Sequence, residues 1–183
     1  GDWYRRAEED VLELGGDPNR ASHQLAASSP QASPPANFDF MAAGNNQAAL
    51  GFPKEVVHTG HIAKLLNESV KGNYLPLGGK TGPYERSINP MAPRDEKVGA
   101  NDVWEGRNQG FGERGTFTPA QHEFMTGNRR RIAEKLNKEK FAGRDNWMPD
   151  EVQAAAWVHT RALKYMKEKP GLTYQEAFDM SNK

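Results

Sequence analysis

The chain has 183 residues, a length that fits one domain of ordinary size. Its 24 basic and 24 acidic residues give a formal net charge of zero. A generic polycation for nucleic acid is therefore excluded, and a nucleic-acid surface must be a local patch. The absence of cysteine excludes disulfides, thiolate zinc sites and cysteine nucleophiles. No apolar run approaches the length of a membrane span and no signal peptide is recognisable, so we expect no membrane partner.

The first third of the chain shows helical spacing of its apolar residues. Residues 2–14 predict a helix, because Trp3, Ala7, Val11 and Leu14 fall on one face of it. A second helix is expected after the pair Asp17-Pro18 and extends to about residue 27, with Ala21 and Leu25 facing inward.

Residues 28–37 are rich in serine, proline and alanine, and two interpretations remain open. They could form a linker, or a helix junction in which Ser33 caps and Pro34 begins the next helix. The apolar residues on both sides favour the junction. Gln31 and Asn37 would then be polar groups beside a helix start, suited to bonding with the backbone or with a ligand.

Residues 53–71 predict another helix, in one or two pieces, with Ile62, Leu65, Leu66 and Val70 in its apolar stripe. His58 and His61 lie three positions apart, a spacing that could place both on one face. A zinc site needs further ligands that the sequence does not supply, so we expect surface or capping histidines, no metal and no cofactor.

The stretch at residues 72–89 departs from the amphipathic helical pattern on either side of it. The departure is clearest in the run LPLGGKT at residues 75–81. Gly78 and Gly79 predict a tight turn, and Lys80-Thr81 opens a new helix. Such a hairpin can present backbone N–H groups and the lysine amine to a phosphate. A buried Lys80 amine could also act as a nucleophile. The alternative is a solvated loop lysine.

Asp102 stands before the apolar helical run that begins at Val103. It could be a helix N-cap, which is the usual role of aspartate in that position. It could instead be a carboxylate that stabilises an oxocarbenium ion or activates water, opposite Lys80.

The last third predicts three helices, which begin near residues 119, 149 and 174. The first, the longest, has Phe124, Ile132 and Leu136, with Ala133, on its apolar side. The helix carries three consecutive arginines, Arg129–Arg131, and Arg107 precedes it. Two interpretations remain open: the arginines form a solvated face, or they bind phosphates. The four tryptophans are expected in the core, and the alternative is that one of them stacks on a nucleic-acid base.

The fold class is therefore predicted to be all-α: a compact multi-helix domain of eight to ten helices, without a sheet. We expect a single domain over residues 1–183, in which residues 118–183 supply helices that complete the core.

Three segments resemble, in order, motifs of helix-hairpin-helix DNA glycosylases of the endonuclease III type. LAASSPQ at 25–31 with Asn37 after it resembles their "SxQ…N" junction, LPLGGKT at 75–81 resembles "LPGVGxKT", and VGANDVWEGR at 98–107 is similar to "VDTHVxR". The resemblance covers residues 21–112 and implies a helix-hairpin-helix fold. By it, Lys80 takes the place of the Schiff-base lysine and Asp102 that of the catalytic aspartate.

The same order of segments is also similar to uncharacterised helical domains of tailed-phage proteins, with an "AxSPQ…N" and a later "VTxDxW…R" segment. The two resemblances together imply a phage-type helical domain that binds DNA and cleaves the glycosidic bond of a flipped base. Its DNA contacts would come from Gln31, Asn37, Gly78, Gly79, Thr81, Arg107 and Arg129–Arg131. The alternative is a non-catalytic module on the same fold, associated with the virion or with other phage proteins. Either would act in the host cytoplasm or in the phage particle.

Overall fold

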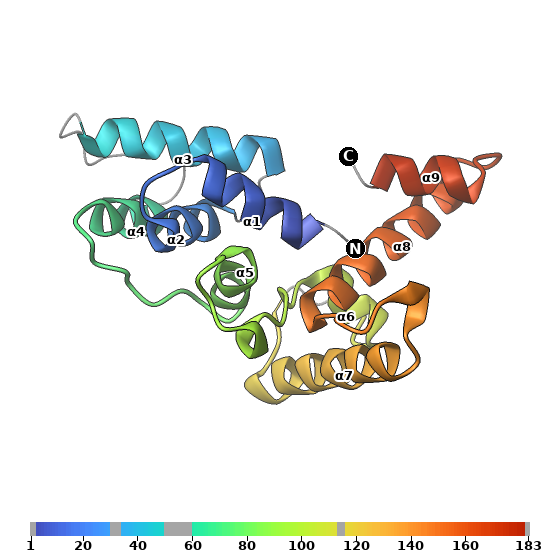
Figure 1. Cartoon of the computed structure of the whole chain (residues 1–183). Helices are drawn as coiled ribbons and strands as arrows, with labels where there is room; N and C mark the ends of the chain where they lie inside the picture. Colours follow the sequence, from blue (N-terminus) through green and yellow to red (C-terminus); the bar gives the residue numbers. More distant parts are fainter. Residues whose placement is uncertain (1–2, 30–33, 50–59, 113–115, 182–183) are drawn as a thin grey trace. The chain divides into compact units, whose positions relative to one another are not determined.

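The computed structural model describes residues 3–29, 34–49, 60–112 and 116–181 (Figure 1). The regular structure in these ranges is helical and includes no strand, which confirms the all-α prediction. Its nine α-helices and two 3₁₀ turns are α1 (Trp3–Glu13), α2 (Pro18–Ser28), α3 (Pro34–Ala49), α4 (Gly60–Val70), α5 (Thr81–Ile88), η1 (Arg94–Glu96), α6 (Val103–Asn108), α7 (Pro119–Lys138), η2 (Phe141–Gly143), α8 (Pro149–Glu168) and α9 (Tyr174–Ser181).

The chain forms two compact units. The N-terminal unit is Arg5–Glu96, and the C-terminal unit combines the start of α1, through Tyr4, with the chain from Lys97 onward. The boundary lies inside segment 21–112, over which the glycosylase resemblance extends. The expectations of a single domain and of a helix-hairpin-helix arrangement stay predictions.

In the N-terminal unit, α2 packs against α3, α4 and α5, and α3 packs against α4. The apolar core joins Ala27 of α2 to Ile62, Leu65 and Leu66 of α4. Gly44 allows the close approach of α3, because a Cβ atom there would lie 2.6 Å from Cδ1 of Leu66. The expected inward positions are confirmed for Ala21, Leu25, Ile62, Leu65 and Leu66, which are buried, whereas Val70 is only partly buried.

In the C-terminal unit, α8 is the central element and packs against α6, α7 and α9. Figure 1 shows α8 in orange beside α9 in red. Val158 and Ala162 of α8 and Ala177 of α9 are buried. Gly106 lets α6 approach the segment before α7, because a Cβ atom there would lie 2.4 Å from Cζ of Phe117.

Several helix boundaries follow the cap signals of the sequence. Asp17 accepts a hydrogen bond from the N–H of Asn19 at 3.0 Å at the start of α2. Thr118 and Gln121 form a reciprocal capping box at α7, as predicted. Thr173 and Glu176 bond in the same reciprocal way at the start of α9. Helix α3 begins at Pro34, as the junction interpretation predicts. Ser33, His58 and residues 53–59 lie outside the described residues.

The prediction for the inward face of α7 is wrong for Phe124 and Ile132 and is confirmed for Ala133. Phe124 and Ile132 are 50% and 44% exposed, and the buried residues are Met125, Arg129 and Ala133. These three follow i, i+4 spacing, so they form one continuous stripe. An arginine can take the middle of the stripe because a carboxylate from α6 neutralises it, as described below.

Two further expectations about the core are wrong. Leu14 is 47% exposed, since α1 ends at Glu13 and leaves it beyond the helix. None of the four tryptophans is fully buried. Trp104, Trp147 and Trp157 instead carry a guanidinium group over the ring, an arrangement that suits a partly exposed indole.

No helix in the described ranges is both long enough and apolar enough to cross a membrane. Within the same ranges, no group of three or more histidine, aspartate or glutamate side chains could hold a metal ion.

Candidate nucleic-acid interface

The predicted hairpin is the connection from α4 to α5, residues 71–80. The hydroxyl of Tyr74 donates to Oδ2 of Asp17 at 2.5 Å, and the Tyr74 ring lies 5.4 Å from that of His23. This hydrogen bond lowers the pKa of Asp17 and raises the pKa of Tyr74. Leu75 and Leu77 pack against the core of the unit. The connection is therefore anchored to α2 and α4 before it reaches the two glycines.

The start of α5 is open to solvent. Gly78, Gly79 and Lys80 are exposed, and Lys80 occupies the N-cap position without a capping side chain. The Gly78 carbonyl accepts from the N–H of Gly82 at 2.8 Å. In the described part of the chain, no hydrogen bond involves the N–H groups of Gly79, Lys80 or Thr81. The positive end of the α5 dipole thus presents three N–H donors beside a lysine side chain.

Gly78 is not required by the packing of the fold. Its φ is outside the left-handed region, and a Cβ atom there would meet only Oγ1 of Thr81, at 3.9 Å. Alanine would therefore fit. A glycine that the fold does not need is consistent with a backbone that a ligand approaches closely.

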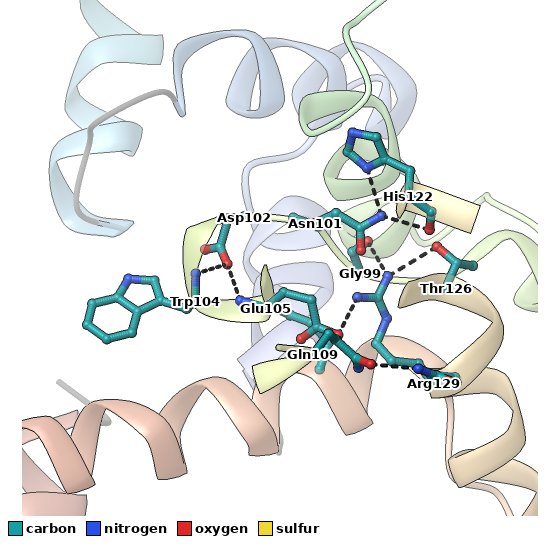
Figure 2. Close-up of polar contacts among 12 residues, drawn as sticks. Gly99, Asn101, Asp102, Trp104, Glu105, Gln109, His122, Thr126 and Arg129 are labelled. Atoms are coloured by element: carbon teal, nitrogen blue, oxygen red, sulfur yellow. Dashed lines mark hydrogen bonds and ion pairs between the residues drawn. The ribbon is translucent and has the colours of Figure 1, made fainter. Parts of the chain in front are cut away.

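Asp102 is the N-cap of α6. Its Oδ1 accepts from the N–H groups of Trp104 and Glu105, both at 3.0 Å (Figure 2). The capping interpretation is confirmed. The cap occupies one carboxylate oxygen, and a catalytic role for the carboxylate stays a prediction.

Asn101 links the start of α6 to α7. Its buried amide Nδ2 donates to Nδ1 of His122 at 2.9 Å and to the His122 carbonyl at 3.3 Å (Figure 2). Nδ1 must lack a proton to accept this bond, so the neutral ring carries its proton on Nε2. Burial, and then the charge of Arg129, lower the pKa of His122. The ring is therefore neutral at pH 7.

Arg129 is part of the interior of the C-terminal unit. Its Nη1 lies 2.9 Å from Oε1 of Glu105, and both side chains are 1% exposed. Its Nη2 donates to the Gly99 carbonyl and to Oγ1 of Thr126 at 3.4 and 3.3 Å (Figure 2). Gln109 donates to the same Glu105 oxygen. A phosphate contact by Arg129 would require the loss of this ion pair.

The neighbouring arginines are placed differently. Arg130 and Arg131 are exposed on α7, and Arg131 donates to Oδ1 of Asn128. Arg107 lies over the Trp104 ring, with Cζ 4.3 Å from the ring centroid. A phosphate contact by any of the three stays a prediction.

Asn37 is 3% exposed and holds the junction of α2 and α3. Its Nδ2 donates to the Leu25 carbonyl at 3.0 Å, and its Oδ1 accepts from Oγ of Ser28 at 2.6 Å. It also bonds the hydroxyl of Tyr84, whose pKa is raised by burial. The predicted bonding of Asn37 to the backbone is confirmed. Gln31 lies outside the described residues.

The structure thus brings Gly78, Gly79, Lys80 and Thr81 together in the N-terminal unit. It places Asp102, Arg107 and the three arginines of α7 in the C-terminal unit. The sequence patterns did not predict the group formed by buried Asn101 and Glu105 with partly buried His122. The position of Arg129 between Met125 and Ala133, at i, i+4 spacing, was a signal that it faces inward.

Comparison with known proteins adds no assignment. No family model matches the chain, and neither a curated protein nor a solved structure matches it.

Proposed function

We propose that the protein binds the phosphate backbone of DNA at the start of α5. The proposal is supported by three N–H groups, at Gly79, Lys80 and Thr81, that have no hydrogen-bond partner among the described residues, together with the exposed Lys80 side chain. A helix N-terminus favours anions through its free donors and its dipole. The lysine adds a full positive charge.

The proposed contact is local and independent of base sequence. Acidic residues outnumber basic ones in residues 5–96, so the N-terminal unit has no general attraction for a polyanion. Binding then depends on this turn and on contacts elsewhere in the chain. Phosphate contacts release condensed counterions, so the affinity must fall steeply as salt rises.

The test is the salt dependence of duplex binding for two lysine variants. Lys80→Gln removes the charge at the start of α5. Lys71→Gln is the matched control, because Lys71 begins the same connection but is paired with Glu68 at 2.7 Å. We expect Lys80→Gln to weaken binding and to reduce the slope of log Kobs against log salt by roughly 0.9, the value for one phosphate. Equal behaviour of the two variants would contradict the proposal.

Base excision extends this proposal and is supported only by the motif resemblance. By the motif resemblance, the deprotonated Lys80 amine would form a bond to C1′ of the sugar while the glycosidic bond breaks, and Asp102 would stabilise the cationic sugar. The base would leave with the proton that the amine gives up, and opening of the sugar ring would turn the new C–N bond into the imine that borohydride reduces. Borohydride trapping on damaged DNA tests this step, with Lys80→Ala as the control. A trapped adduct that forms equally well without Lys80 rules out the lysine as nucleophile.

The non-catalytic alternative is supported by the exposed apolar residues of the C-terminal unit. Phe124 and Ile132 on α7, and Phe141 in η2, are exposed large side chains. Such side chains suit contact with another protein, including other phage proteins. A protein that fails to bind duplex DNA at low salt, with its fold intact, would favour this alternative.

A further inference from the structure

Two residues on either side of Phe141 hold a backbone conformation that side chains disfavour. Lys140 and Ala142 have φ angles of 48° and 53°, and among the described residues no others except glycines have a positive φ. In this left-handed region the Cβ atom crowds the following carbonyl oxygen. Backbone strain of this kind persists only where surrounding contacts hold it, and it is concentrated at functional sites.

Contacts on both sides hold the connection between α7 and α8. Asn137 bonds both backbone groups of Trp147: its Nδ2 donates to the carbonyl at 3.0 Å, and its Oδ1 accepts from the N–H at 2.5 Å. The indole Nε1 of Trp147 donates to the Phe141 carbonyl at 3.2 Å. Arg144 donates to both carboxylate oxygens of Glu151, at 2.8 and 2.9 Å. Phe141 is therefore held in one position by contacts within the unit.

The Phe141 side chain extends into solvent from this position. It is 55% exposed, and all of residues 138–143 are exposed. Its ring contacts the protein on the side of Trp147, where the ring centroids lie 6.0 Å apart. An exposed phenylalanine buries little apolar area, so its outward position adds little to the stability of the fold. A side chain held outward in this way suits insertion into an apolar slot of a partner.

Positive charge flanks Phe141. Lys138 and Lys140 are exposed, and their amines form no hydrogen bond or ion pair with any residue that the structure describes. Glu139, between them, pairs with Lys135 at 3.9 Å on the surface. Phe124, which is 50% exposed on α7, has the acidic Glu123 beside it instead. A slot that accepts Phe141 should therefore carry negative charge at its edges, as the step between two base pairs does.

We infer that Phe141 is a wedge that enters duplex DNA between two base pairs, while Lys138 and Lys140 contact the phosphates beside that step. The inference rests on the proposed DNA-binding function and names what the C-terminal unit adds to it, which is local unstacking of the bound duplex. Apolar side chains inserted in this way partly unstack a base step and kink the duplex. Unstacking costs less where a mismatch already weakens the stack, so mismatched duplex should bind more tightly.

The test uses a short duplex with a fluorescent adenine analogue beside a central mismatch, and a fully paired duplex of equal length. Stacking quenches the analogue, so unstacking by the wild type should raise its fluorescence. We expect Phe141→Ser to lose most of this rise. The wild-type preference for the mismatched duplex, about fivefold or more, should fall below about twofold in this variant. Phe124→Ser is the matched control, since it removes a similarly exposed phenylalanine from a regular helix.

Further variants separate insertion from a general loss of structure. Phe141→Leu keeps a large apolar side chain and should retain the fluorescence rise. Lys138→Gln and Lys140→Gln should each lower the slope of log Kobs against log salt by roughly 0.9. Circular dichroism confirms the helical content of each variant.

Each other outcome decides a different claim. Equal fluorescence rises with Phe141→Ser and Phe124→Ser overturn the wedge. Duplex binding that depends on Lys80, without any fluorescence rise in the wild type, overturns the wedge and leaves the proposed function in place. A wild-type protein that binds neither duplex at low salt overturns both.

Discussion

Removing one partner of the buried pair between Glu105 and Arg129 should destabilise the C-terminal unit strongly. Both side chains are 1% exposed and their charged atoms lie 2.9 Å apart. Loss of one partner leaves the other charge buried and uncompensated, which costs about 3–5 kcal/mol in such pairs. The variant Arg129→Met keeps much of the side-chain length and removes the charge, so it isolates this effect.

The free energy of unfolding is measured by urea titration, followed by tryptophan fluorescence, because three tryptophans lie between residues 104 and 157. The double variant Glu105→Gln with Arg129→Met removes both charges and should recover a large part of the loss. The exposed pair of Lys164 and Glu168 supplies the control, and Lys164→Met should cost about 0.5 kcal/mol or less. A loss below about 1 kcal/mol for Arg129→Met would refute the reasoning, since it would mean that Glu105 regains solvent or a new partner.

Four further substitutions of single residues in the same unit are expected to change its stability. The pKa of His122 lies below its ordinary value of 6.5 in the folded protein. Because the unfolded chain then binds the proton more readily, the free energy of unfolding should fall as the pH drops below about 6.5. His122→Asn should flatten that part of a profile of stability against pH. Gly106→Ala should destabilise by about 1–3 kcal/mol, because its Cβ would lie 2.4 Å from Phe117. In Gly127→Ala on α7, the added Cβ meets no atom within 4 Å, so this variant should stabilise the protein by about 0.5–1 kcal/mol. Equal melting temperatures for Gly106→Ala and Gly127→Ala would contradict the close packing at Gly106. Thr118→Ala should cost about 1 kcal/mol through loss of the α7 cap, and an unchanged melting temperature would show that the capping box does not stabilise the helix.

Local signals in the sequence were sufficient for the helices. Two helix starts are marked by a proline, which follows Asp17 and Thr118, and the structure confirms both. A third is marked by a glutamate three residues after Thr173, and it is confirmed as well. Such signals act within one turn, so they need no knowledge of the tertiary structure. The all-α class followed from them.

The inward face of a helix was harder to predict, because it depends on its partner. On α7 the apolar residues Phe124 and Ile132 suggest one face, but the partner helix α6 supplies Glu105 and so favours burial of Arg129. A charged side chain can be buried in the core only when a residue from another part of the chain places an opposite charge beside it. The sequence alone does not show that Glu105 contacts Arg129.

The candidate site was predictable in part. The exposed turn at Gly78 and Lys80 follows from glycine and helix-start signals, and so does the capping role of Asp102. The buried contacts of Asn37 depend on Ser28 and Leu25, which approach it only through the turn between α2 and α3. The pairing of Trp104 with Lys164 joins residues sixty positions apart, a separation over which no local pattern acts.

The most direct test of the account is duplex DNA binding by wild type, Lys80→Gln and Lys71→Gln across a range of salt concentrations. If the start of α5 binds DNA phosphates, the wild type binds in a salt-dependent way and Lys71→Gln keeps the wild-type slope. Lys80→Gln then binds more weakly, with a slope smaller by roughly 0.9. A wild-type affinity that does not respond to salt, or a Lys80→Gln slope equal to that of the wild type, would contradict binding of DNA phosphates at the start of α5.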